Sequence, residues 1–287
     1  MMLIVGIVFA LICVFGGYLL HHGSMKVFVV AYTEYIIIGG GAIGIFVASN
    51  GMAVTKRAIA QIMELLKPDP FVDKAEYMKL LVMMYQLFSV ARRDGLLGLE
   101  PHMEDPHKST IISKNHSFLH HSHCSAFFCD TMKVVISGGV APFDLAEMMD
   151  IDLESAKAEA HVVPDSISSV GDALPAIGIC ACVLGVVITM DKIGGDAKIL
   201  GQSVAVALVG TFLGVFGAYF LVAPVARALG NRHRGEENYM LAMKHALFSF
   251  ARGESPITCV EFARRQIEPS CRPGFSEMEK ALKASKG

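Results

Sequence analysis

The chain has 287 residues, of which 53% are hydrophobic and only 18% are charged, and its formal net charge is −2. A soluble domain usually has about a quarter of its residues charged, so this composition argues against one. The nearly balanced charge also argues against nucleic acid as a partner. The apolar residues are concentrated in four blocks, which is typical of an integral membrane protein.

Each of the four blocks predicts one transmembrane helix. The blocks cover residues 1–20, 35–55, 173–190 and 199–226. A helix needs about 20 apolar residues to cross the hydrocarbon core of a bilayer, and the four blocks reach or approach that length. The first block lacks the positive charge that precedes the apolar core of a cleaved signal peptide, which favours a retained helix.

The distribution of Lys and Arg predicts the orientation in the membrane. The two short links between paired spans hold only Lys26, Lys192 and Lys198, whereas the other basic residues lie in 51–171 and 227–287. Positive charge stays on the cytoplasmic side. We therefore expect both termini in the cytoplasm and very short outer loops.

The expected fold class is all-α, with four transmembrane helices and a large helical cytoplasmic region. The predicted segments are 1–55 with the first two transmembrane helices and a short periplasmic loop, 56–171 as a cytoplasmic helical domain, 172–226 with the third and fourth transmembrane helices, and 227–287 as a cytoplasmic C-terminal helix and arm.

Within the cytoplasmic region, the spacing of apolar residues predicts several helices. One covers residues 75–93 and ends before Gly95, and a second covers 117–136 and ends at Gly138. A third, acidic helix over 144–161 is expected to be interrupted at Pro164.

The four apolar blocks contain no Asp, Glu, Lys, Arg or His. Ionisable residues inside the membrane usually mark a proton or ion path. The chain is therefore expected either to conduct no ions or to use a carboxylate supplied by another chain.

A few special residues inside the third and fourth blocks are candidates for shaping a path. Pro175 is either a favourable residue near a helix start or a hinge facing a pathway. Gly210 and Gly214 form a small-xxx-small pattern that predicts close helix packing. Thr211 either bonds to its own backbone or lines a polar route, and Pro224 lies near the cytoplasmic face, where a kink is tolerated.

A run of histidines resembles a metal-binding pattern. It comprises His116, His120, His121 and His123, followed by Cys124. His116 and His120 are four residues apart and could reach one ion from a helix, but no second cluster completes a zinc site. We therefore prefer a solvent-facing or interhelical run and expect no metal.

The sequence lacks disulfide, nucleotide-binding and hydrolase patterns. The seven cysteines are an odd number and indicate small packing residues or free thiols, not a disulfide framework. The sequence has no Walker loop, no nucleotide-binding glycine fingerprint and no nucleophile–His–acid set, which argues against an ATP-driven pump or a hydrolase. We expect neither an enzyme nor a bound cofactor.

Several stretches together carry a resemblance to a known family. They are Phe15-Gly16-Gly17-Tyr18, residues 34–44, Arg92 to Glu100, Val170 to Gly178, Val209 to Gly214, and Pro224. In these stretches the chain resembles the MotA family of flagellar stator proteins, within the wider group that includes ExbB and TolQ. The resemblance covers essentially the whole chain, and the stretches are specific only in combination.

The resemblance implies a stator subunit of the bacterial inner membrane that couples inward ion flow to torque. It implies five copies around two copies of a MotB-type subunit, each with one transmembrane helix whose Asp takes the translocated proton. Arg92 and Glu100 match charged residues that contact the rotor protein FliG. Pro175 and Pro224 match two functional prolines, and Thr211 matches a channel-facing threonine.

The resemblance also bears on the coupling ion and on the competing functions. Ala173 lies where some sodium-driven relatives have a hydroxyl residue, which favours protons over sodium. The histidine run departs from the family, which has ordinary helix there. One alternative function is an ExbB or TolQ-type energiser of envelope transport, whose members typically have three spans and an outer N-terminus. Another is a metal-sensing membrane receptor built on the histidine run.

Overall fold

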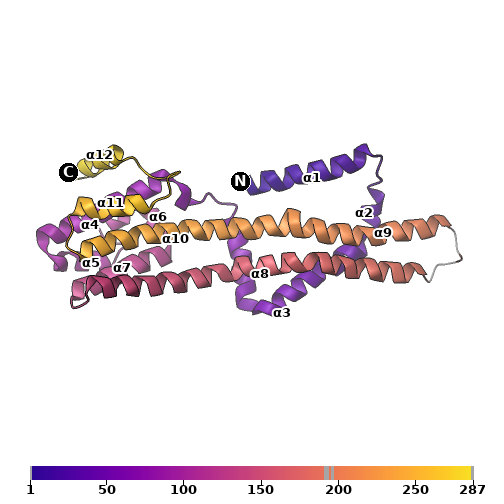
Figure 1. Ribbon diagram of the computed structural model, residues 1–287, viewed down its shortest axis with the longest axis horizontal. Coiled ribbons are helices and arrows are strands. Elements are labelled where there is room, and N and C mark those ends of the chain that lie inside the picture. Colours follow the sequence, from indigo (N-terminus) through magenta and orange to yellow (C-terminus); the bar gives the residue numbers. More distant parts are fainter. Residues whose placement is uncertain (1, 191–193, 195–196, 286–287) are drawn as a thin grey trace. The chain divides into compact units, whose positions relative to one another are not determined.

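The computed structural model describes residues 2–190, 194 and 197–285. The described residues form helices joined by short connections, without a strand among them, which confirms the all-α prediction (Figure 1). Most of the link between the third and fourth spans, including Lys192, lies outside the described residues. The chain divides into two compact units, which are described separately below.

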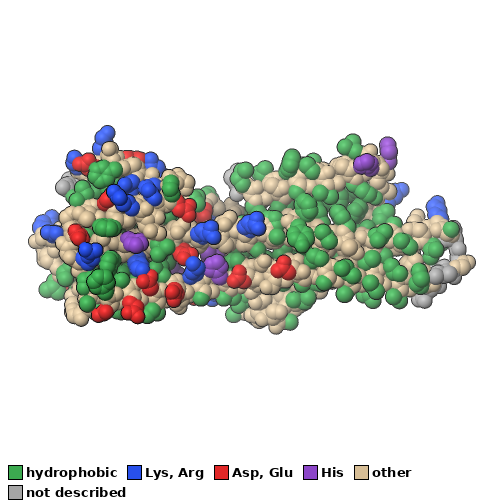
Figure 2. Space-filling view, in the orientation of Figure 1, with side chains coloured by type: hydrophobic (Ala, Val, Ile, Leu, Met, Phe, Trp, Pro, Cys, Tyr) green, Lys and Arg blue, Asp and Glu red, His purple; other side chains and the backbone are tan. Residues whose placement is uncertain are grey.

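The first unit comprises Met1–Pro68 and His161–Asn231. Its elements are α1 (Met2–Leu20), α2 (Lys26–Val30), α3 (Tyr32–Glu64), the second part of α8 (Pro142–Met190), α9 (Ala197–Phe216), the π-helical segment η4 (Gly217–Val222) and the first part of α10 (Ala223–Ala251). Among the described residues, four helices are long and apolar enough to cross a membrane, with α9 to α10 counted as one, as the sequence predicts. Hydrophobic side chains cover the visible surface of this unit (Figure 2).

Aromatic side chains hold the first two helices of this unit against α9. The ring of Phe15 on α1 lies 5.4 Å from that of Phe28 on α2 and 6.1 Å from that of Phe212 on α9, between centroids. Phe28 lies 5.6 Å from Phe212, and these pairs all meet edge to face. This geometry is favourable for aromatic rings beyond the apolar area they bury.

Helix α3 is broken in the middle and tied to α8 at the same level. Gly51 has a φ of 70°, a conformation that non-glycine residues rarely adopt. The neighbouring Asn50 accepts a hydrogen bond of 2.6 Å from the hydroxyl of Ser166 on α8. A polar bond between apolar helices fixes their relative position, and here it does so beside the break.

The second unit comprises Asp69–Ala160 and Arg232–Gly287. Its further elements are η1 (Pro70–Val72), α4 (Lys74–Asp94), η2 (Leu96–Leu99), α5 (Glu100–Glu104), η3 (Ile112–Lys114), α6 (His116–His120), α7 (Ser122–Ser137), α11 (Pro256–Gln266) and α12 (Phe275–Ala284). One large apolar core lies among α4, α7, α10 and α11, and charged side chains gather on the visible surface (Figure 2).

The helices predicted for this region are confirmed in part. Helix α4 ends at Gly95, whose φ of 82° suits a glycine at a helix end, and α7 ends at Gly138 in the same way. The helix predicted over 117–136 is divided at His121 into α6 and α7.

The predicted interruption at Pro164 is wrong, because α8 continues through Pro164 to Met190. A proline removes one hydrogen bond from a helix but does not end it if packing holds both sides. Val163 and Ile167 flank the proline and are buried in one cluster with residues of α3 and α10. This packing explains why the helix continues.

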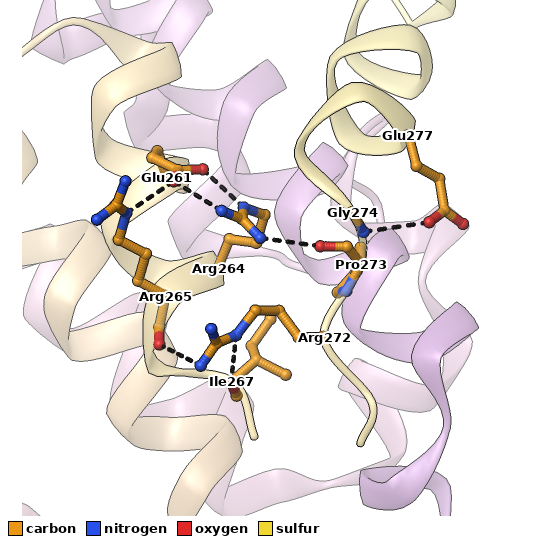
Figure 3. A network of polar contacts seen from close by, with 8 residues as sticks. All are labelled: Glu261, Arg264, Arg265, Ile267, Arg272, Pro273, Gly274 and Glu277. Atoms are coloured by element: carbon orange, nitrogen blue, oxygen red, sulfur yellow. Dashed lines mark hydrogen bonds and ion pairs between the residues drawn. The ribbon is translucent and has the colours of Figure 1, made fainter. Parts of the chain in front are cut away.

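A network of arginines closes the C-terminal end of the second unit (Figure 3). Arg264 donates two hydrogen bonds, of 2.7 and 2.8 Å, to the carboxylate of Glu261 and one of 3.0 Å to the carbonyl of Pro273. Arg272 donates to the carbonyls of Ile267 and Arg265. Together these bonds fasten the connection between α11 and α12.

Charge pairing at Glu261 makes this network sensitive to acid. The hydrogen bonds from Arg264 hold the pKa of Glu261 below its ordinary value of 4.5. A carboxylate with a lowered pKa in the folded state stabilises the fold above its ordinary pKa. That stabilisation is lost as the pH falls through the folded-state value.

Replacing Arg264 should weaken the C-terminal arm more than replacing its neighbour Arg265. The Arg264 side chain is 13% exposed and binds two groups, whereas Arg265 is 72% exposed. We expect Arg264→Ala to lower the free energy of unfolding by about 1–3 kcal/mol and Arg265→Ala by less than about 1 kcal/mol. Hydrogen exchange of α11 and α12 measures both, and equal effects would contradict this interpretation.

Candidate functional site

The backbones of α8 and α9 touch at three glycines. A Cβ added to Gly178 would lie 2.7 Å from the carbonyl oxygen of Gly210 and 3.0 Å from the Cα of Gly214. A Cβ added to Gly214 would lie 2.7 Å from the carbonyl oxygen of Leu174. No side chain fits at this crossing, so the small-xxx-small prediction of close packing is confirmed.

Helix α3 packs against this pair and completes the centre of the first unit. A Cβ added to Gly41 on α3 would lie 3.3 Å from the Cγ2 of Ile177 on α8. The buried residues of this cluster come from α3, α8 and η4: Ile38, Leu174, Ala181 and Ala218. The contacts at the glycines keep α3, α8 and α9 close together.

One acidic side chain enters the packed centre. Glu34 lies in the first turn of α3, where it is 3% exposed. Its Oε2 atom lies 2.6 Å from the position that a Cβ on Gly210 would take, and its Oε1 atom lies 3.6 Å from that of Gly185. The carboxyl group therefore occupies space that two glycines leave open between α8 and α9.

This position corrects the expectation that no ionisable residue lies inside the spans. The second apolar block begins at Tyr35, but α3 begins at Tyr32 and brings Glu34 into the bundle. The sequence contains one sign of this arrangement, since Gly185 and Gly210 provide space where most residues would fill it. The two glycines predict a space for Glu34 only when the pairing of α3 with α8 and α9 is known.

Pro175 lies inside α8, next to the glycine crossing. Its ring removes one backbone donor, so the carbonyl of Gly171 lacks its usual partner within the helix. Gly171 itself packs closely, since a Cβ there would lie 3.1 Å from the Cγ1 of Val222 in η4. Pro175 and the nearby Ala173 are partly exposed. The proline therefore marks a weakened turn of α8 whose other side is tightly packed.

Thr211 follows Gly210 directly on α9 and is partly exposed. Thr131 and Thr189 each donate a hydrogen bond of 2.7 Å to the carbonyl four residues earlier. Among the described residues, the hydroxyl of Thr211 makes no such bond. Its predicted role in lining a polar route stays a prediction.

A π-helical segment lies just before Pro224. In η4 the helix is wider than an α-helix, and it ends at Val222, two residues before the proline. A proline ring clashes with the carbonyl four residues earlier in a regular α-helix. The wider turn relieves that clash, and such turns often mark functional positions. The sequence gives no signal for the π-helix beyond the proline itself.

Arg92 and Glu100 lie in the second unit, on either side of a tight turn. Arg92 is in the last turn of α4, and Glu100 begins α5, with η2 between them. Both side chains are exposed. Arg92 donates a hydrogen bond of 3.2 Å to the carbonyl of Gly253, which links this turn to the end of α10.

The histidine run does not form a metal centre in the described part of the chain. No group of three or more His, Cys, Asp or Glu side chains is placed to hold an ion there. The ring of His121 packs against Phe71 at 4.5 Å between centroids. Cys124 is buried, and its thiol lies 3.9 Å from the carboxylate of Glu236. The run therefore includes a contact between helical segments, one of the two roles preferred from the sequence.

A single methyl group at the crossing should disturb the transmembrane bundle. Gly214→Ala places a Cβ 2.7 Å from a backbone oxygen, and backbone cannot move aside cheaply. We expect a loss of about 1–3 kcal/mol in stability. Gly201→Ala on the same helix meets nothing within 4 Å and serves as the control. Thermal unfolding of the detergent-solubilised protein measures both, and equal midpoints would contradict the proposed contact.

Comparison with known proteins agrees with this architecture. Residues 4–95 match the family model described as Motility protein A N-terminal, and residues 120–242 match that of the MotA/TolQ/ExbB proton channel family. A chain from the structure of C. jejuni MotAB has a TM-score of 0.75 at 20% identity, with 93% of this chain and 97% of that chain covered. This likeness shows the fold.

Two curated relatives show the family. Motility protein A of Escherichia coli strain K12 is 35% identical over 286 residues, which cover 100% of this chain and 96% of the relative. Motility protein A of Salmonella typhimurium is 34% identical over 284 residues, which cover 99% and 96%. The chain therefore belongs to the motility protein A family, within the MotA/TolQ/ExbB proton channel group.

Proposed function

We propose that this chain is a stator subunit of the bacterial flagellar motor, which couples inward ion flow to torque on the rotor. The observation that carries this proposal is the glycine crossing of α8 and α9, with Pro175 and Thr211 beside it, in a chain that matches motility proteins over its full length. The close backbone contact holds α8 and α9 together, and Pro175 leaves one turn of α8 without a backbone hydrogen bond, so that turn can bend.

The proposed pathway is completed by a second protein. Glu34, the buried acid of the spans, is enclosed by α8 and α9 of its own chain, so a path along the outside of the bundle needs another carboxylate. A MotB-type subunit with one transmembrane helix and a membrane Asp supplies it. The relation to MotAB structures supports this partner, and we propose five copies of this chain around two of the partner.

The second unit is proposed to contact the rotor. Arg92 and Glu100 are exposed at one turn, and exposed charges of both signs make a surface that can dock against a complementary one. We propose FliG as the protein that binds there. This assignment places both termini of the chain and the second unit in the cytoplasm, on the side of the basic residues.

Protons are the proposed coupling ion. A sodium site needs several oxygen ligands, as hard cations do in general. Ala173, beside Pro175, offers no hydroxyl group, and Thr211 is a single one. The alternative of an ExbB or TolQ-type energiser is less favoured, since the relatives that match the full chain are motility proteins and four helices here can span a membrane.

Straightening α8 at Pro175 should abolish motility. Pro175→Leu returns a backbone donor to the carbonyl of Gly171 and stiffens the yielding turn. In a non-motile stator deletion strain, the unchanged chain together with its partner subunit should restore swimming, whereas Pro175→Leu should not. An immunoblot of the membrane fraction shows whether the variant is inserted. Normal swimming of the variant would contradict the proposed role.

Reversing the charges at the rotor-facing turn should also reduce motility. Arg92→Glu together with Glu100→Lys inverts the proposed docking surface while ion flow is kept. Arg93→Glu is the control, since Arg93 is a neighbouring exposed residue that pairs with Asp94. We expect the double variant to lose most of its swimming speed and the control to keep it, as measured by cell tracking. Equal speeds would refute rotor contact at this turn.

A further inference from the structure

Glu34 has a combination of properties that the proposed function does not use. Of the described acidic side chains, it is the one that is buried. Its Oε2 atom has no hydrogen-bond partner among the described residues. A buried polar atom without a partner costs free energy, so such an atom needs a physical explanation.

The space around the carboxyl group of Glu34 has the size of that group and is lined by apolar groups. Gly185 on α8 and Gly210 on α9 leave the room, and any larger residue at Gly210 would collide with Oε2. A Cβ at these two positions would also meet Ala207 and Ala181, at 2.8 Å and 3.3 Å. The walls of the space are therefore backbone and methyl groups, which cannot neutralise a charge.

Among the residues that the structure describes on the surrounding helices, none brings an opposite charge close to Glu34. The one charged residue of α9 is Lys198, twelve positions before Gly210, or about 18 Å along the helix. On α8, the nearest charged residue before Gly185 is Asp172, which is acidic. Cys182 lies closer, but a thiol carries no positive charge. Lys26 begins α2, eight residues before Glu34. A bare carboxylate in this place is very unfavourable, so the carboxyl group carries a proton in this conformation.

The position of the group along the membrane suits proton entry. Glu34 is the third residue of α3, and Gly185 lies five residues before the end of α8, about 8 Å along its axis. In the proposed orientation, these ends face the outside. The carboxyl group therefore lies in the outer half of the bundle, close enough to the surface for water to reach it when α8 and α9 separate slightly.

We propose that Glu34 is a proton-binding site that this chain itself contributes to the coupling path. When the α8–α9 gap opens, the Glu34 carboxylate takes a proton from hydronium, forming an O–H bond and leaving water. When the proton moves on, that bond breaks and the proton passes to water or to the partner's carboxylate, so charge and atoms balance. This inference rests on the proposed ion-coupled function.

A proton-collecting carboxyl group matters most when protons are scarce outside. The closing experiment therefore measures swimming speed against external pH for the unchanged chain and for Glu34→Gln, which keeps the size and cannot carry the proton. Glu64→Gln, on an exposed residue at the other end of α3, is the control. We expect the ratio of variant to unchanged speed to fall at least about twofold from pH 6 to pH 8, with the control ratio flat.

A spectroscopic measurement makes the test direct. Infrared difference spectra of the membrane-embedded complex, titrated through the same pH range, should show the stretch of a protonated carboxyl group that Glu34→Gln removes and Glu64→Gln keeps. Failure of the unchanged chain to support swimming would refute the proposed function. A working chain whose Glu34→Gln variant keeps a flat speed ratio and the full carboxyl band would overturn the inference about Glu34.

Loss of swimming at every pH is also decisive. In that case Glu34→Asp, which retains an acid, is compared with Glu34→Gln at equal amounts in the membrane. Partial rescue by aspartate assigns the loss to the missing proton and supports the proposal. Without rescue, Glu34 is a packing residue and the proposal is wrong.

Discussion

The contact between the backbones of α8 and α9 governs the rest of the transmembrane unit. Lipid tails are as apolar as leucine side chains, so helices in a bilayer gain little from hiding apolar surface from lipid. They associate by close packing, and Gly178, Gly210 and Gly214 bring the backbones of the two helices into van der Waals contact. The same crossing fixes where Pro175 and Thr211 lie and leaves room for the carboxyl group of Glu34.

The tightly packed glycine contact lies next to turns of α8 and η4 whose helical hydrogen bonding is interrupted. The glycine crossing resists movement, whereas Pro175 in α8 and the π-helical segment before Pro224 interrupt the hydrogen-bond ladder of their helices. In the proposed mechanism, protonation near this crossing tilts one end of a helix about the glycine contact. The ion pathway and the mechanical element are then the same pair of helices, which suits a protein that converts ion flow into movement.

The features that sequence could predict are local ones. Apolar runs of about 20 residues identified the four spans, and Gly95 and Gly138 ended helices because their positive φ angles favour glycine. Helix α8 passes through Pro164 because buried neighbours on α3 and α10 hold it, which no local pattern reveals. The burial of Glu34 is not predictable from local pattern either, because it depends on Gly185 and Gly210, which lie far along the chain. The roles of Arg92 and Glu100 come from family resemblance, since their geometry alone is that of exposed charges.

In the proposed complex, this chain forms the wall of an ion path whose essential carboxylate belongs to a second protein. Proton influx into energised vesicles tests it most directly, with the chain alone, with a MotB-type single-span subunit, and with that subunit's membrane Asp replaced by Asn. We predict influx only when the chain and the unchanged partner are both present, because Glu34 by itself is enclosed and completes no route. Equal influx through the chain alone, or through the Asn form of the complex, would contradict the account.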